Sequence, residues 1–265
     1  MRKARWALFF LLTPLFSSLS IAGQMGFSGT VEYRRLAPAF GDTASLSFSP
    51  GARFEEENWA VGGYLPLLLQ NENKMARVGS MTVPSGSPMM EGQTSDHMGG
   101  GSGMSGARLA VGDLNIAASY RLITEHSIWP AIWLNLQTKI PTATNGFGTG
   151  KFDLGGGLGF KKILFDSILL ISDFGYLAIG DPGYRNPFAF GFGGGPLSLA
   201  DGALALLLYY QGSTPILEGL AGQSQLSLGA NLKVADSLIL STTFSKGFSN
   251  STPQITLSAG FTYYH

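Results

Sequence analysis

The chain has 265 residues, with 17 lysines and arginines against 17 aspartates and glutamates, so there is no basic excess to hold nucleic acid. It contains no cysteine, which excludes a disulfide framework and thiol chemistry. Its 37 glycines, 12% aromatic residues and only 13% charged residues disfavour a helical protein and predict an all-β fold.

The first 22 residues have the pattern of a secretory signal peptide. The segment opens with three basic residues, continues with an apolar stretch over 6–16, and places the small residues Ser20 and Ala22 before a plausible cut. A retained membrane anchor is the alternative, although the apolar stretch is too short to span a bilayer. We expect a cleaved signal over 1–22 and a mature chain over 23–265.

Alternation of apolar and polar residues predicts strands along the rest of the chain. Twelve strands are expected, near 25–35, 43–55, 59–70, 108–122, 127–139, 150–161, 167–178, 186–198, 203–211, 222–234, 237–248 and 254–264. In the last of them Leu257, Phe261 and Tyr263 share one face, and polar residues share the other. The run Glu55-Glu56-Glu57 fits either a turn or part of a strand.

Strand length and turn asymmetry favour a membrane barrel over a soluble β-sandwich. Globular strands average about five to six residues, whereas tilted membrane strands need about 9–11. Three very short turns carry Asp166, Asp201 and Asp236 at equal spacing, as in a hairpin repeat, and most other connections are longer. The pattern predicts a closed antiparallel up-and-down transmembrane β-barrel of about 12 strands in a Gram-negative-type outer membrane, with both termini periplasmic.

The connection over 71–106 is rich in Met, Gly and Ser and is expected to be extracellular. Thioether and imidazole groups suit a soft metal such as Cu(I) or Ag(I) in an oxidising compartment. The candidate metal ligands are Met89, Met90, His97, Met98 and Met104. Their spacing is irregular, so an ordinary disordered surface loop is the alternative interpretation.

The polar strand faces are expected to line the lumen. The lumen-facing candidates are Arg121, Trp129, Trp133, Lys139, Lys151, Asp153, Asp173 and Lys233. Charges of both signs argue against a strongly charge-selective pore. The alternative interpretation is that these side chains pair with one another across the lumen and fill it.

Apolar inward residues are expected to form a layer near the periplasmic end of the barrel. They are Trp129, Trp133, Leu169, Ile171, Leu207 and Ile239. This layer suits either the passage of a hydrophobic solute or packing that closes a narrow barrel. Inward glycines at 155, 157, 159, 193 and 195 either leave a passage or mark bent strands.

Short glycine-rich pieces recur in a fixed order over residues 108–265. They are Gly112-Asp113, Lys139-Ile140-Pro141-Thr142, the run 146–150 with Asp153 after it, Gly175-Tyr176, and Gly247-Phe248-Ser249 with Pro253. In these pieces the chain resembles the family named for a MetA pathway of phenol degradation, which are outer-membrane proteins often labelled transporters. The resemblance implies movement of small hydrophobic or aromatic compounds. The chain departs from the pattern in ending on His265 rather than on an aromatic residue.

An enzyme is not expected, because none of the three histidines falls on a predicted strand near the outer rim, where a base for lipid-directed chemistry would stand. No cofactor is predicted. The expected partners are the lipid bilayer and lipopolysaccharide, the outer-membrane assembly machinery and a small hydrophobic solute. Three hypotheses remain: a channel or transporter, an envelope protein whose loop binds soft metal, and a structural barrel filled by its own side chains.

Overall fold

The computed structural model describes residues 23–35, 39, 44–70, 75–78, 81–84, 108–144, 147–197, 199–200 and 202–265. The predicted signal peptide and the five candidate metal ligands lie outside these residues. The first strands are β1 (Gln24–Arg35), β2 (Ala44–Glu55), β3 (Trp59–Tyr64), β4 (Leu67–Gln70), β5 (Met75–Val78), β6 (Met81–Pro84), β7 (Arg108–Val111) and β8 (Leu114–Ile123). The others are β9 (Ala131–Ile140), β10 (Asp153–Leu164), β11 (Ile168–Ile179), β12 (Phe188–Pro196), β13 (Leu204–Ser213), β14 (Ser224–Ala235), β15 (Leu238–Gly247) and β16 (Ile255–Tyr264).

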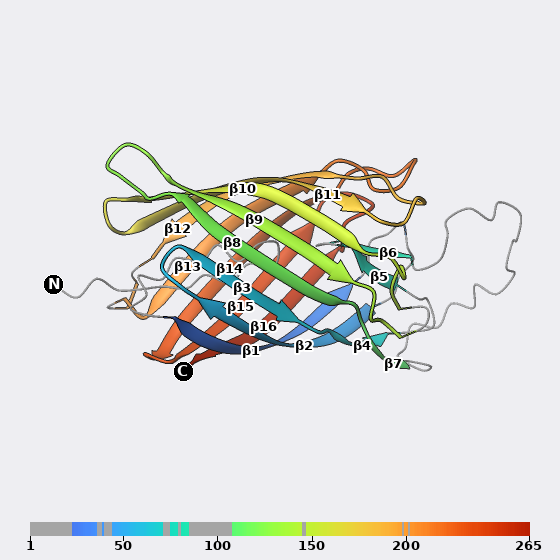
Figure 1. Ribbon diagram of the computed structural model, residues 1–265, viewed down its shortest axis with the longest axis horizontal. Helices are drawn as coiled ribbons and strands as arrows, with labels where there is room; N and C mark the ends of the chain where they lie inside the picture. The colour runs from blue at the N-terminus through green and yellow to red at the C-terminus, as the bar shows by residue number, and fades with distance from the viewer. Residues whose placement is uncertain are drawn as a thin grey trace, which may run out of the picture.

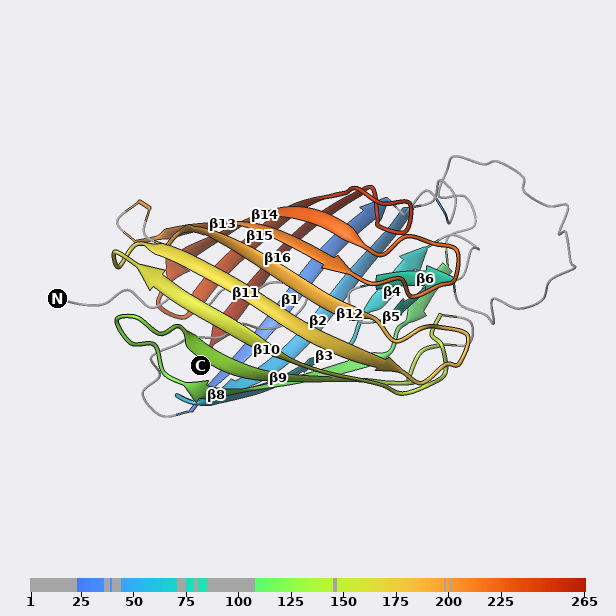
Figure 2. The same ribbon diagram turned by 90° about the horizontal axis from the view of Figure 1, so that it is seen from above.

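The strands close into a barrel of twelve antiparallel staves (Figure 1). Each stave pairs with its sequence neighbours, and closure comes from β1, which pairs with β16 on one side and with β2 on the other. Two staves are interrupted, so that β3 and β4 form one stave and β7 and β8 form the next. The strands run obliquely to the long axis (Figure 2), as barrel closure requires. The predicted fold is confirmed.

Proline and glycine residues explain why three strands begin or break at other residues than predicted. The predicted strand 59–70 is broken at Pro66, which has no N–H for the ladder, and the carbonyl oxygen of Pro66 accepts the N–H of Gly112 at 2.7 Å instead. The predicted strand 127–139 begins only at Ala131, after Pro130. The predicted strand 150–161 begins only at Asp153, because Gly150 has φ +68°.

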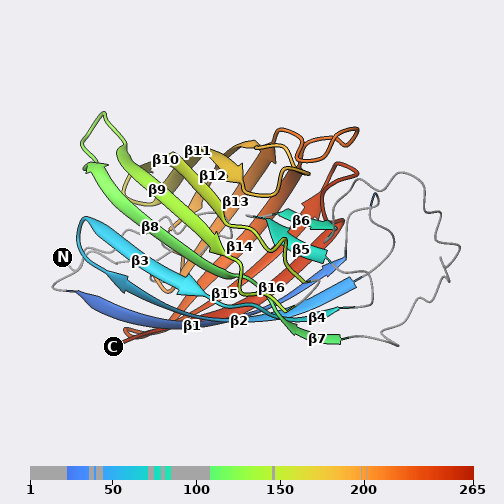
Figure 3. The same ribbon diagram turned by 45° about the vertical axis from the view of Figure 1, so that its right-hand side comes forward.

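The two ends of the barrel differ in their connections. The very short turns lie at one end, called here the turn end, where the chain reverses after β10 and after β14, with Phe165 and Asp166 at positive φ. The longer connections lie at the other end, called here the loop end (Figure 3). β1 begins and β16 ends at the turn end, where Gly26 pairs with Tyr264. Within the predicted loop 71–106, the structure has a separate hairpin, β5–β6.

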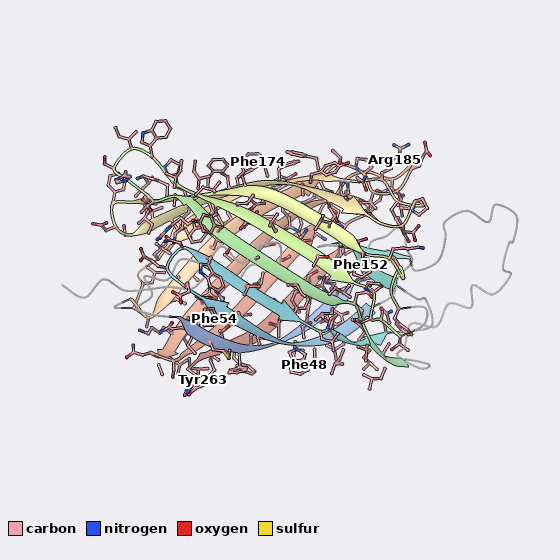
Figure 4. All side chains as sticks on the ribbon, viewed as in Figure 1. Phe48, Phe54, Phe152, Phe174, Arg185 and Tyr263 are labelled. Carbon is pink, nitrogen blue, oxygen red and sulfur yellow. The ribbon has the colours of Figure 1, made fainter. Side chains whose placement is uncertain are left out.

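The outer surface of the barrel is apolar. Leu257, Phe261 and Tyr263 are each exposed by 44–47%, whereas Thr256 and Thr262 beside them on the inner face are at most 4% exposed. Figure 4 shows Phe48, Phe174 and Tyr263 projecting away from the wall. A water-soluble protein would bury such a band, so this exterior is the lipid-facing surface of a membrane barrel. The described residues include no helix suited to crossing a membrane.

Candidate functional site

The barrel interior has two contrasting walls, and the first is rich in hydroxyl and amide groups. It is formed by the inward positions of β14, β15, β16, β1 and β2. Cross-strand pairs hold it together: the hydroxyls of Ser227 and Ser245 lie 2.8 Å apart, and the Ser241 hydroxyl donates to Asn231 Oδ1 at 2.6 Å. Such a wall offers hydrogen bonds to water or to a polar solute.

The second wall, on β10 to β13, is apolar at both ends. At the turn end, a buried cluster consists of Leu169, Ile171, Leu197, Ala205, Leu207 and Tyr209, with Ile163 packed against it. At the loop end, another consists of Leu177, Ile179, Tyr184 and Ile216, with Leu217 packed against it. Of the predicted apolar layer, Trp133, Leu169, Ile171, Leu207 and Ile239 are buried in the turn-end half of the barrel, on β9, β11, β13 and β15, whereas the loop-end cluster was not predicted.

A strip of glycines on β12 separates the two clusters and carries a tyrosine. A Cβ at Gly191 would lie 1.9 Å from Tyr209 Oη, and one at Gly193 would lie 2.4 Å from the Leu208 carbonyl oxygen. The Tyr209 ring thus crosses β12 from β13, and its hydroxyl donates to Asp173 on β11. Here the inward glycines at 191 and 193 admit a tyrosine ring and a close approach of the neighbouring backbone.

A buried charge cluster sits at the loop end. Lys139 Nζ lies 2.8 Å from Asp153 Oδ2 and 3.6 Å from Asp113 Oδ2, and it donates to Thr149 Oγ1 at 2.6 Å. All three charged side chains are less than 5% exposed. Each carboxylate also accepts a backbone N–H from a connection: Asp113 from Ala143 at 3.0 Å and Asp153 from Gly180 at 3.1 Å. The cluster therefore fastens the 141–152 and 180–187 connections to the barrel wall.

The same cluster reaches the apolar side through Tyr184. This tyrosine belongs to the loop-end apolar cluster, in the connection between β11 and β12. Burial, the largest cause, and the nearby carboxylates of Asp181 and Asp153 together raise its pKa to about 12. Tyr184 is therefore neutral at all physiological pH values.

The turn end holds separate ion pairs. Arg121 pairs with Glu57 at 3.0 Å, and its guanidinium lies over the Trp133 ring, 5.7 Å from the ring centroid. Arg53 pairs with Glu55, and both side chains are buried. Lys233 Nζ lies 2.6 Å from Asp236 in the turn after β14. Charges of both signs thus balance one another locally at this end.

Between these two ends, some of the inward positions remain partly accessible. Ser28 and Thr30 on β1, Gly175 on β11 and Thr243 on β15 are all only half-buried. Inward residues nearer the ends are more covered, for example Trp133 at 3% and Lys139 at 3% exposure. Ser119 and Asn135, in register with Gly157 and Gly175 at mid-height, are also only 3% exposed, so the inner face is partly accessible on some strands and covered on others.

The structure places six of the eight lumen candidates on the inner face of the barrel and two elsewhere. Those inside are Arg121, Trp133, Lys139, Asp153, Asp173 and Lys233. The prediction for Trp129 is wrong: this residue lies in the turn before β9 and is 67% exposed, because the strand begins only after Pro130. The prediction for Lys151 is also wrong: it is exposed in the connection before β10, where Gly150 has a positive φ and the strand has not yet begun.

Two inner features were not among the predicted site residues. The Arg53–Glu55 pair follows the alternation of Ser47, Ser49 and Gly51, which would have placed both residues inside. The Tyr209–Asp173 contact joins strands that are not neighbours in the sheet, so alternation alone could not find it. Among the described residues, no group of three or more acidic or histidine side chains could hold a metal.

These features define a class: a membrane-spanning up-and-down barrel whose interior is lined by side chains of mixed character. Solved structures share this fold. An outer-membrane channel from Pseudomonas putida F1 aligns with a TM-score of 0.61 and 13% identity over 95% of this chain and 98% of that one. The KdgM porin aligns with a TM-score of 0.54 and 7% identity over 90% of this chain and 98% of that one. A second KdgM structure, in complex with disordered oligogalacturonate, aligns at 0.51 with 5% identity over 91% and 98%.

The chain therefore has the fold of outer-membrane channels and porins. No protein-family model matches its sequence, and no curated protein does. The resemblance to the family named for a MetA pathway of phenol degradation accordingly stays a prediction.

Proposed function

We propose that this barrel is an outer-membrane channel for small, mainly uncharged or hydrophobic molecules. The observation that carries the proposal is the two-sided interior, in which apolar clusters lie at both ends of the wall on β10 to β13, while hydroxyl and amide groups line the wall on β14 and β15. Such a lumen offers a solute apolar contact on one side and hydrogen bonds on the other. An aromatic alcohol or a similar amphipathic molecule matches both walls.

The paired interior charges support passage of uncharged rather than ionic solutes. Glu32 and Arg34 pair at 2.6 Å, and Lys139 lies between two carboxylates. Because neighbouring charges of opposite sign compensate each other, no ring of one sign exists along the described strands to attract a particular ion.

The orientation in the membrane follows from the connections. We place the turn end and both ends of the mature chain in the periplasm, with the loop end outside, because short periplasmic turns and long external loops are usual in such barrels. A signal peptide over 1–22 would deliver the chain across the inner membrane, and the outer-membrane assembly machinery would insert it.

Liposome swelling tests the proposal. Purified full-length protein is reconstituted into liposomes, and swelling is followed in an aromatic glycoside, which is uncharged and crosses lipid slowly, and in an arylsulfonate of similar size. We expect faster swelling in the glycoside than in the sulfonate, and neither solute should enter protein-free liposomes. Absence of swelling with either solute, in vesicles shown to contain folded barrel, would refute the channel.

A structural barrel filled by its own side chains is the second candidate. The low exposure of Leu207, Trp133 and Lys139 favours it, because well-packed ends would block a lumen. This candidate predicts no solute entry even when the folded barrel is present, so the same assay separates the two functions.

The soft-metal function also stays a proposal, for which the composition of the 71–106 connection is the support. Titration of the whole protein with Cu(I) tests it against a variant in which Met89, Met90, Met98 and Met104 are alanine and His97 is glutamine. Equal affinity of the two proteins would remove the metal-binding hypothesis.

A further inference from the structure

One inward carboxylate, that of Asp173, differs from the other charges of the inner wall. Ion pairs with carboxylates engage the inward cations Arg34, Arg53, Arg121, Lys139 and Lys233. Asp173 lies in the middle of β11 and forms no ion pair with any described residue. Because a carboxylate inside a protein is costly without a counter-ion, this position favours a cation from outside the chain.

The strands on both sides of Asp173 supply no cation to it. The inward residue directly across from Asp173 is Gly159 on β10 and Gly191 on β12. The inward cation of β10, Lys161, is in register with Ile171, one inward position nearer the turn end. The charge of Lys161 interacts with Glu125, which lies in the turn after β8. The negative charge of Asp173 is therefore left to the lumen.

The carboxylate is held in place on one side and open on the other. The Tyr209 hydroxyl donates to Asp173 Oδ1. Oδ2 accepts no hydrogen bond from a described residue, and Asp173 is only half-buried, so a donor in the lumen can reach this oxygen. The next inward residue towards the loop end is Gly175, and the three atoms nearest a Cβ placed there are backbone atoms of Gly156 and Gly157. The wall beside the carboxylate is therefore bare backbone.

A second acceptor, on the far side of this backbone patch, also lacks a donor. Asn135 on β9 is in register with Gly157, which is in register with Gly175. Asn135 Oδ1 is buried and has no hydrogen-bond partner among the described residues, which costs free energy. Asn135 is only 3% exposed, so Asp173 is the accessible acceptor of the two. The missing groups are hydrogen-bond donors, and an ammonium group has three donors and no acceptor.

The surroundings favour an organic cation over a metal ion. Metal ions such as Ca²⁺ need several oxygen ligands, and the described residues contain no group of three acidic or histidine side chains that could hold one. Towards the turn end, the neighbours of Asp173 are Ile171, Leu207 and Tyr209, which belong to one buried apolar cluster. An organic ammonium needs only one carboxylate and carries its own apolar body.

From this arrangement we infer that Asp173 is the anchor of a lumenal binding site for a primary organic ammonium ion. The ammonium donates a charge-assisted hydrogen bond to Asp173 Oδ2, and Tyr209 holds Oδ1 in place. The apolar body of the ligand lies over the backbone patch at Gly157 and Gly175. The inference concerns binding, so it stands or falls separately from the passage of uncharged solutes.

Isothermal titration calorimetry of the folded protein in detergent micelles, with 2-phenylethylammonium chloride at neutral pH, tests this inference. Titrations of protein-free micelles are subtracted. We expect saturable binding to the wild type and at least about tenfold weaker binding to Asp173→Asn, because a hydrogen bond to a charged group contributes about that much. Asparagine keeps an acceptor for the Tyr209 hydroxyl, so the variant should fold, and urea unfolding establishes this.

Two controls make the test specific to a lumenal carboxylate that binds a cation. Asp166→Asn removes an exposed carboxylate in the turn after β10 and should bind the ammonium like the wild type. The uncharged 2-phenylethanol, which has nearly the same shape, should bind the wild type as weakly as the ammonium binds Asp173→Asn. Absence of saturable binding to the wild type, unchanged binding in Asp173→Asn, or an equal loss in Asp166→Asn would overturn the site. Equal binding of the alcohol would overturn recognition of the positive charge.

Discussion

Replacing Lys139 by methionine should destabilise the barrel strongly, because the change leaves two buried carboxylates without their cation. Lys139 Nζ lies 2.8 Å from Asp153 and 3.6 Å from Asp113, and none of the three side chains is more than 4% exposed. Removing one partner from a buried ion pair costs about 3–5 kcal/mol. Methionine nearly preserves the side-chain volume, so the expected loss is electrostatic rather than a cavity effect.

A triple variant makes this prediction specific. In Lys139→Met/Asp113→Asn/Asp153→Asn, the buried charges are removed together, and each asparagine keeps a carbonyl oxygen for the N–H of Ala143 or Gly180. We expect the triple variant to recover most of the stability lost in Lys139→Met, since replacing a whole buried charge group is often close to neutral. Urea unfolding in lipid vesicles, followed by tryptophan fluorescence, measures both. The reasoning is refuted if Lys139→Met lies within about 1 kcal/mol of the wild type, or if the triple variant is as unstable as the single one.

Three further predictions concern the tryptophans, the glycine strip and Tyr184. In the same unfolding assay, Trp133→Ala should lower the free energy of unfolding by about 3–5 kcal/mol and Trp129→Ala by less than about 1 kcal/mol. The reason is that Trp133 is 3% exposed and Trp129 is 67% exposed. Similar losses in the two variants would contradict these placements. Gly191→Ala should displace the Tyr209 ring, and the stability lost should be recovered when Tyr209→Ala is added. In Gly193→Ala the new methyl group meets the Leu208 carbonyl oxygen, so adding Tyr209→Ala should not recover the stability. Equal recovery in the two double-mutant cycles would disprove this. The raised pKa of Tyr184, about 12 against an ordinary value near 10, means that unfolding releases its proton between these values, so stability present below pH 10 should be lost as pH rises towards 12. Tyr184→Phe should flatten this decline, and an identical decline in both proteins would rule out Tyr184 as its source.

Alternation along the chain was sufficient to predict the barrel and its two faces, because a strand exposes every second residue to lipid. The outward set Leu257, Phe261 and Tyr263 is exposed as expected, and the turns at Asp166 and Asp236 lie where the spacing placed them. Strand beginnings were less predictable. Apolar residues such as Ile128 and Trp129 occur in an exposed turn as readily as in a strand, and there Pro130 sets the bound.

The interior could be predicted only in part, since alternation gives the face of a residue but not its partner. Lys139 and Asp153 were expected inside, but their contact depends on register, which pairs the two residues directly across β9 and β10. Likewise, Gly191 and Tyr209 look unremarkable in the sequence. The ring reaches Asp173 because Gly191 has no side chain at the place that the Tyr209 hydroxyl occupies.

The central claim, a solute path through the middle of the barrel, is tested most directly by two single-cysteine variants, because the native chain has no cysteine. Thr243 faces the lumen and is half-buried, and Thr242 beside it on β15 faces lipid. A charged, water-soluble thiol reagent should modify Thr243→Cys in liposomes and slow glycoside entry, while leaving Thr242→Cys unmodified and its uptake unchanged. If Thr243→Cys stays unreactive in the folded barrel, or reacts without any effect on uptake, the lumen is not the path.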